Sequence, residues 1–212
     1  MPYNQIRTIV TLFENIGFKG RHCTLVDDTP DLKIYDFIKK ASSIMIHRGP
    51  NYNSALPAKV SFHSGVNYEL PQLILEPGRY SDLRYPLSFN DRIVSVSFTL
   101  GQFPASPDPI SSIQVVGELY VDKDYKGRKL IVVQDIADLH AWAAFGDNVT
   151  SVKVFAGPNY APGSKLRLYR NKNYLGGEIA LDPGDYPNLN ASHAFNDVVS
   201  SVKVNSAGAP IL

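Results

Sequence analysis

The chain contains an internal repeat at a shift of 106 residues, and repeated sequence implies repeated architecture. Residues 60–98 align with residues 166–204 without a gap, and 12 of these 39 positions are identical. The identities fall on turn formers and aromatic residues, including the tripeptide FND that begins at Phe89 and again at Phe195. The preceding halves also match, at a shift of 107 to 108 residues. We therefore expect two similar domains in tandem.

Each of these domains is itself double. The pattern aromatic, four residues, aromatic, one residue, glycine occurs in three copies, which begin at Phe13, Tyr120 and Tyr169. A fourth copy begins at His63 and has lost the first aromatic and the glycine. Glycine can adopt the positive φ that a folded hairpin requires. The sequence thus predicts four units, each of which opens on a folded hairpin.

Each unit ends in hydroxyl residues followed by alternating apolar positions, which is the pattern of a half-buried strand. In the last unit, Val202 and Val204 are expected to face inward and Lys203 outward. The chain also has 15 glycines and 15 prolines, and 11% of its residues are aromatic, as is typical of short strands and tight turns. We predict an all-β chain of two tandem Greek-key β-sandwich domains, with no helix beyond a turn near residues 136–144.

The predicted boundaries follow the repeat. Residues 1–101 form the first domain and residues 115–206 form the second. The segment 102–114 is a proline-rich linker, which predicts a stiff and extended connector. Residues 207–212 form a short tail. Such a connector allows the domains to pair within one chain or between two chains, so the sequence leaves a homodimer open.

Charge and composition argue against several classes of protein. The 21 basic and 20 acidic side chains give a net charge of +1, which provides no electrostatic footprint for nucleic acid or a membrane surface. The first residues lack the apolar stretch of a secretion signal, so a cytoplasmic location is expected. Cys23 is the single cysteine and is expected to be a buried structural thiol. The five histidines are scattered and no phosphate-binding glycine loop is present, so we expect no enzyme.

The hairpin copies and the serine near the end of each unit resemble the βγ-crystallin superfamily, from about Val10 to Val204. The segments FNDVVSSVKV and GDNVTSVKV also resemble the calcium-binding signature of its microbial and invertebrate, non-lens members. That signature runs Asn/Asp, Asn/Asp, two free residues, Ser/Thr, Ser. The resemblance implies a calcium-binding protein with a structural or stress-protective role.

The chemistry of the residues is compatible with calcium. Ca²⁺ is a hard cation that takes six to eight oxygen ligands at about 2.3–2.6 Å, and Asn, Asp, hydroxyl and carbonyl groups supply such oxygens. Zinc would require closely spaced Cys and His, which this sequence does not offer. With one carboxylate per site, we expect dissociation constants of roughly 10⁻⁶ to 10⁻³ M. The alternative is that Asn-Asp followed by Ser is an ordinary turn that leads into a strand.

In the family, the Asn/Asp end of one unit's signature pairs with the Ser/Thr of the other unit, which makes two sites per domain. The side-chain ligands that the resemblance implies are Asp147 with Ser200, Asn196 and Asp197 with Thr150, and Asn90 and Asp91 with Ser42. The carbonyl ligands that it implies, from the residue after the first hairpin aromatic, are those of Glu14, Val121 and Arg170.

A fourth site would need oxygen ligands where the sequence has Ile38, Lys39 and Val94. These side chains offer no oxygen, and one of them is a cation, so this site is expected to be lost. The resemblance therefore implies about three calcium ions per chain. Two other functions stay open at this point: a carbohydrate- or protein-binding module that uses Tyr52 and Tyr160, and a secreted toxin or inhibitor on the same sandwich.

Overall fold

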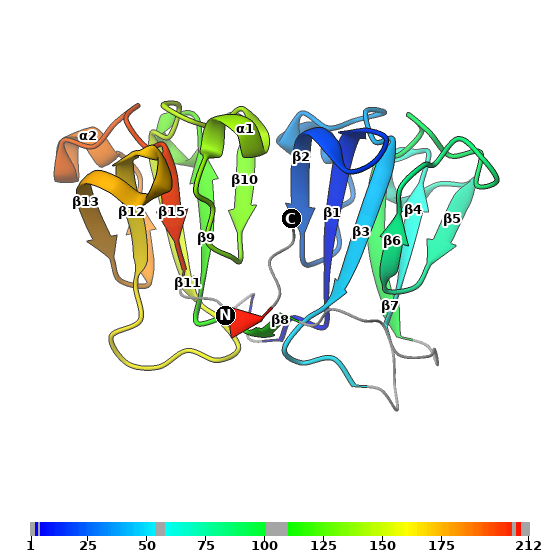
Figure 1. The fold of residues 1–212 in the computed structure, drawn as a ribbon, viewed down its shortest axis with the longest axis horizontal. Helices are drawn as coiled ribbons and strands as arrows, with labels where there is room; N and C mark the ends of the chain where they lie inside the picture. The colour runs from blue at the N-terminus through cyan, green and yellow to red at the C-terminus, as the bar shows by residue number, and fades with distance from the viewer. Residues whose placement is uncertain (1–2, 4, 54–57, 101–109, 205–206, 209–212) are drawn as a thin grey trace. The chain divides into compact units, whose positions relative to one another are not determined.

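The computed structural model describes residues 3, 5–53, 58–100, 110–204 and 207–208 (Figure 1). Most of the predicted linker therefore lies outside the described residues. Backbone contacts divide the chain into two compact units. The first domain is built on Ile6–Ile110, and the second on Ser111–Pro210 together with Met1–Gln5. No helix in the described part of the chain is long and apolar enough to cross a membrane.

The first domain has two antiparallel sheets. One has the order β2-β1-β3-β6 and the other the order β5-β4-β7. Its strands are β1 Thr8–Asn15, β2 Lys19–Leu25, β3 Ser43–Arg48, β4 Ala58–His63, β5 Gln72–Leu75, β6 Gly78–Tyr80 and β7 Ser95–Leu100. Two short 3-10 turns interrupt them, η1 Leu32–Tyr35 and η2 Val66–Tyr68.

The second domain repeats this plan, with sheets β10-β9-β11-β14 and β13-β12-β15. Its strands are β9 Val115–Tyr120, β10 Lys129–Val132, β11 Ser151–Ala156, β12 Leu166–Asn171, β13 Leu175–Leu181, β14 Gly184–Tyr186 and β15 Ser201–Lys203. Its helical segments are η3 Lys123–Tyr125, η4 Lys172–Tyr174, α1 Leu139–Ala143 and α2 Leu189–His193. A short pairing joins β8 Ile110–Ser112 to β16 Ala207–Gly208.

Each domain exchanges strands between its two repeats, which is the Greek-key connection that the sequence predicts. In the second domain, β14 comes from the fourth repeat but pairs with β11 of the third, with Val152 opposite Tyr186. In return, Ile136 of the third repeat forms a bridge with Val202 of the fourth. The same exchange joins β6 to β3 in the first domain. Neither sheet is therefore complete without the other repeat.

The core lies between the two sheets of each domain, as the period-2 pattern predicts. In β15, Val202 and the adjacent Val204 are fully buried, while Lys203 is only half-buried. Cys23 is buried, as predicted for a structural thiol. The turn predicted near residues 136–144 is the short helix α1, and the expectation of no further helix is wrong, because α2 forms at the same place in the next repeat. In Figure 1 both helices lie at the same end of the second domain's strands.

A serine locks each folded hairpin at that end of the strands. The Ser151 hydroxyl donates to the Asp122 carbonyl at 2.6 Å and accepts from the Tyr125 amide at 3.0 Å. The rings of Tyr120 and Tyr125 meet edge-on at 5.8 Å and cover the hairpin. The other three repeats have the same serine contacts, through Ser43, Ser95 and Ser201.

In the eroded repeat, His63 takes the place of the missing aromatic and lies 5.6 Å from the ring of Tyr68. The hairpin therefore keeps its fold where the sequence pattern fails.

Candidate metal centre

Four turns of the same geometry occur in the structure, and each lies just before the last strand of a repeat. The residues at the second Asn/Asp position all adopt a left-handed φ of 51–54°, namely Lys39, Asp91, Asp147 and Asp197. Each of these residues donates its amide hydrogen to a carbonyl of the other repeat in its domain, for example Asp147 to Val199 at 2.9 Å. Each turn is therefore hydrogen-bonded to the segment just before the last strand of the opposite repeat.

This interlocking brings together all three side-chain pairs that the sequence predicts. The Thr150 hydroxyl donates to Asp197 Oδ1 at 3.2 Å, and the Ser200 hydroxyl donates to Asp147 Oδ1 at 2.9 Å. In the first domain, the Ser42 hydroxyl lies 3.4 Å from Asp91 Oδ1. Residues about 50 positions apart thus meet at one point because their repeats exchange strands. Their role as metal ligands stays a prediction.

The asparagine before two of these aspartates leaves an oxygen unsatisfied. Asn196 donates its side-chain amide to Asp197 Oδ2, and Asn90 donates in the same way to Asp91 Oδ2 at 2.6 Å. Both asparagine Oδ1 atoms are buried and have no hydrogen-bond partner within the described residues. A buried oxygen without a partner is costly, and a bound cation or an ordered water would satisfy it.

The fourth turn keeps the backbone but not the oxygens. Lys39 has a φ of 53° and donates its amide hydrogen to the Ile93 carbonyl at 2.8 Å, as its aspartate counterparts do with their own partners. The hydroxyl position is occupied by Val94, which is buried. Because this turn forms without any carboxylate, the backbone geometry does not depend on a metal-binding side chain.

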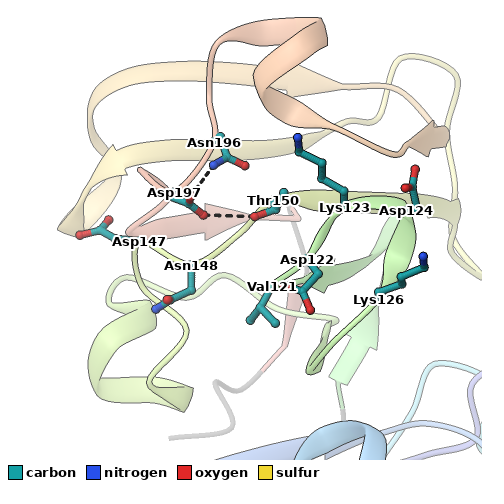
Figure 2. Close-up of a pocket in the computed structure, with 10 residues that line it drawn as sticks. All are labelled: Val121, Asp122, Lys123, Asp124, Lys126, Asp147, Asn148, Thr150, Asn196 and Asp197. Carbon is teal, nitrogen blue, oxygen red and sulfur yellow. Dashed lines mark hydrogen bonds between the residues drawn. The ribbon is translucent and has the colours of Figure 1, made fainter.

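A cavity of about 820 Å³ surrounds the turn at Asp197 in the second domain (Figure 2). Ten residues line it, namely Val121, Asp122, Lys123, Asp124, Lys126, Asp147, Asn148, Thr150, Asn196 and Asp197. They include four carboxylates and two lysines, so the cavity is rich in oxygen and negative in formal charge. Figure 2 shows Asp197 between Asn196 and Thr150, whereas the Asp147 carboxylate points away from them. The two aspartates therefore belong to different sites.

Sequence reasoning missed Asp122, Asp124 and Asn148, which line the same cavity. Asp122 and Asp124 lie between the two aromatics of the third hairpin, and the calcium signature covers only the turn before the last strand. The predicted carbonyl donor Val121 does line the cavity, so the hairpin and the turn face one another. The spacing of the hairpin pattern would have identified both aspartates if the hairpin had been placed against the turn.

The other two predicted carbonyl donors lie at irregularities of their strands. The pairing of β1 with β2 shifts register around Glu14, and the pairing of β12 with β13 shifts around Arg170. Such bulges withdraw a residue from the regular ladder and redirect its backbone groups.

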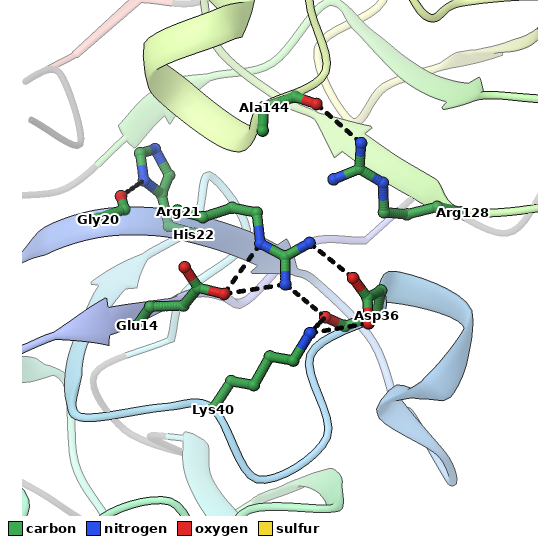
Figure 3. A network of polar contacts seen from close by, with 8 residues as sticks. All are labelled: Glu14, Gly20, Arg21, His22, Asp36, Lys40, Arg128 and Ala144. Carbon is green, nitrogen blue, oxygen red and sulfur yellow. Dashed lines mark hydrogen bonds and ion pairs between the residues drawn. The ribbon is translucent and has the colours of Figure 1, made fainter.

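The side chains of these two residues are engaged elsewhere. The Glu14 carboxylate forms an ion pair with Arg21 at 2.9 Å (Figure 3). The Arg170 guanidinium donates to the Ala194 carbonyl at 3.0 Å.

A histidine to which the sequence analysis assigned no role lies at the second site of this domain. His140 Nε2 is 3.4 Å from Ser200 Oγ and 3.5 Å from Asp147 Oδ2. Its presence there could not be read from the sequence, because His140 is seven residues before Asp147 and outside the calcium signature. Within the described residues, no group of three or more His, Cys, Asp and Glu side chains is placed to hold a metal ion.

Several known proteins are similar to this chain over most of its length. Gamma-crystallin F of Bos taurus is 26% identical over 194 residues, which cover 92% of this chain and 95% of that protein. Gamma-crystallin D of Homo sapiens is 26% identical over 201 residues, with the same two coverages. Among solved structures, the solution structure of Protein S complexed with calcium is similar at 17% identity, with a TM-score of 0.36, and covers 93% of this chain and 99% of that one.

The family model described as Beta/Gamma crystallin matches residues 9–98 and 116–204. These two matches include all four hairpins, all four hairpin-locking serines and the strand exchange within each domain. The chain belongs to the Beta/Gamma crystallin family.

Proposed function

We propose that this protein is a calcium-binding structural protein whose fold is stabilised by the ion and which protects against stress by resisting unfolding. The supporting observation is the arrangement at Asp197, whose carboxylate accepts from a hydroxyl of the other repeat and lines an oxygen-rich cavity with an asparagine whose amide oxygen is unsatisfied. Hard divalent cations prefer such oxygen donors, and six or more of them complete the shell of calcium, with water included.

The proposed ligands are those of the three paired turns. Asn196, Asp197 and Thr150 hold one ion, and the carbonyl of Val121 contributes to the same site. Asp147 with Ser200, and Asn90 and Asp91 with Ser42, hold the other two, with Arg170 and Glu14 as the respective carbonyl donors. When bound, calcium supplies positive charge that joins groups from both repeats.

Stabilisation follows from linkage. An ion that binds only the native state at about 100 times its dissociation constant raises the free energy of unfolding by roughly 2.7 kcal/mol. Because each proposed site joins two repeats, the ion must dissociate before those repeats separate. The expected consequence is a higher melting temperature in calcium, not a change of fold.

The test is a calcium titration by calorimetry on the full chain, with the melting temperature followed in parallel. Asp197→Ala removes the carboxylate, and with it the oxygen ligands of this side chain. Asp185→Ala is the matched control, because Asp185 is exposed in the same domain and lies 3.9 Å from Lys153. We expect about three ions for the native protein and the control, and one fewer for Asp197→Ala.

Two outcomes would contradict the proposal. Absence of both binding heat and thermal shift in calcium would exclude a calcium-stabilised protein. Equal loss of binding in the Asp185→Ala control would show that general negative charge, and not the turn, attracts the ion. A fourth ion would instead show that the turn at Lys39 binds through backbone oxygens alone.

A further inference from the structure

The two sites of the second domain differ in one residue that contacts their ligands. His140 belongs to α1, and its Nε2 lies 3.5 Å from Asp147 Oδ2 and 3.4 Å from Ser200 Oγ. The side chains of His140 and Asp147 are 38% and 52% exposed, so an ion in solution can reach them. An imidazole nitrogen, a carboxylate and a hydroxyl therefore converge at an accessible point.

The backbone holds His140 in this position. The amide of Leu139, at the start of α1, donates to the carbonyl of Ser200 at 2.9 Å. The Asp138 carboxylate caps the helix and accepts from the amide of His140 at 3.0 Å. The first turn of α1 is thus attached to the same residue that supplies the hydroxyl of the site. The backbone position of His140 is thus set by hydrogen bonds to the helix cap and to the opposite repeat.

Gly146 leaves space that the imidazole occupies. A Cβ atom at Gly146 would lie 2.2 Å from His140 Cδ2, so a side chain at this position would have to displace the ring. Gly146 occupies the position of the first asparagine of the signature, where the other two sites have Asn90 and Asn196. The ring of His140 therefore lies against the position from which those sites project an amide side chain. The site at Asp147 lacks that amide and has an imidazole beside it.

The equivalent helix of the fourth repeat lacks this nitrogen. Helix α2 begins at Leu189, whose amide donates to the Thr150 carbonyl at 2.9 Å, as Leu139 does to Ser200. The residue that corresponds to His140 is Asn190. His193, near the end of α2, contacts Ser192 and Tyr186 instead. Within this domain the imidazole is thus specific to the site at Asp147.

A nitrogen donor changes the class of metal that a site prefers. Calcium is bound almost wholly through oxygen, whereas Zn²⁺, Ni²⁺ and Co²⁺ bind imidazole strongly together with carboxylates and water. We propose that His140, Asp147 and Ser200 form a site for a divalent transition metal such as Zn²⁺, which displaces calcium there and nowhere else in the second domain. The displacement of calcium rests on the proposed function, but zinc binding to these residues does not.

The test is a zinc titration of the full chain by calorimetry, at a pH above 7 because metal binding requires neutral imidazole. His140→Asn gives the site the residue that the other helix has at this position, and His193→Asn is the matched control. We expect one zinc ion for the native protein and the control, and none for His140→Asn. In saturating calcium, zinc should release one calcium ion from the native protein and none from His140→Asn.

A second measurement keeps the test independent of folding. In the native protein, zinc should shift the ring resonances of His140 in a ¹H–¹⁵N spectrum of the imidazoles and leave those of His193 in place. Zinc binding that His140→Asn leaves intact, or that His193→Asn also abolishes, would overturn the proposal, as would an unshifted His140 ring. Zinc binding with no calcium binding would refute the proposed function and uphold this site. Calcium binding with no zinc binding would do the reverse.

Discussion

Burial of His22 should make the free energy of unfolding of the first domain depend on pH. This residue lies on β2 with 5% of its surface exposed, and its ring is 5.0 Å from the ring of Phe13. Its Nδ1 is 3.1 Å from the Gly20 carbonyl (Figure 3). Burial lowers the pKa of His22 from 6.5 to about 4, although the hydrogen bond to Gly20 opposes this change. The native state therefore holds a neutral imidazole.

The size and sign of the effect follow from proton linkage. Above pH 6.5 the imidazole is neutral in both states and His22 costs the native state nothing. Below pH 6.5 the unfolded chain binds a proton that the native state does not, so the free energy of unfolding falls as pH decreases. Each pKa unit corresponds to about 1.4 kcal/mol, so the total loss approaches about 3 kcal/mol, and it levels off below a pH of about 4.

The assay is urea unfolding of the native protein and of His22→Gln at a series of pH values across this window. The difference between the two proteins at each pH cancels the titration of carboxylates and of the other histidines. We expect the native protein to lose stability relative to the variant as pH falls from 6.5 to about 4, and the difference to be flat above 6.5. A difference that does not change with pH, or a pKa of His22 near 6.5 by NMR, would refute the reasoning.

Three further substitutions test other parts of the fold. Gly127→Ala should lower the free energy of unfolding by about 1–2 kcal/mol, because φ is +73° and a Cβ would lie 2.4 Å from Asp122 Oδ2. The melting temperature should fall accordingly, and an unchanged melting temperature would contradict this. Tyr3→Phe removes a hydroxyl that donates to the buried Glu118 carboxylate at 2.6 Å. Urea unfolding should therefore show the second domain destabilised by about 1.5–3 kcal/mol, and a loss of stability confined to the first domain would contradict this. Lys39→Asp should leave the calcium stoichiometry unchanged by calorimetry, because the other two ligand positions of that turn remain apolar; one additional ion would show that a single carboxylate is enough.

The repeat predicted the fold well because it carries long-range information. Matching residues at a shift of 106 identify the two domains and the equivalent turns within them. The pairing of Asp197 with Thr150 was implied by the resemblance to the βγ-crystallin signature and not by the repeat, and the structure brings the two residues together. Asp124 and His140 could not be assigned in this way, because they reach the sites from a hairpin and a helix that the calcium signature does not contain.

The eroded hairpin at His63 illustrates the same difference. The sequence pattern counts His63 as a loss, since it is neither Phe nor Tyr. In the structure, its ring lies edge-on to Tyr68 as the aromatic rings do in the other repeats, at 5.6 Å and an angle of 64°. The hairpin requires a planar ring of suitable size at this position. A sequence pattern that accepts only Phe or Tyr does not recognise that a histidine ring can also pack there.

The turn at Lys39 bears on how calcium would act on this protein. It has the same left-handed φ and the same hydrogen bond to the opposite repeat as Asp91, yet it lacks every side-chain ligand. The backbone of each turn is therefore held by the exchange of hydrogen bonds, and a cation would meet groups that are already close together. Binding to such a site orders little of the chain, so most of its free energy is available to stabilise the native state. A calcium-free protein that is fully folded, with a melting temperature that rises in calcium, follows from this arrangement.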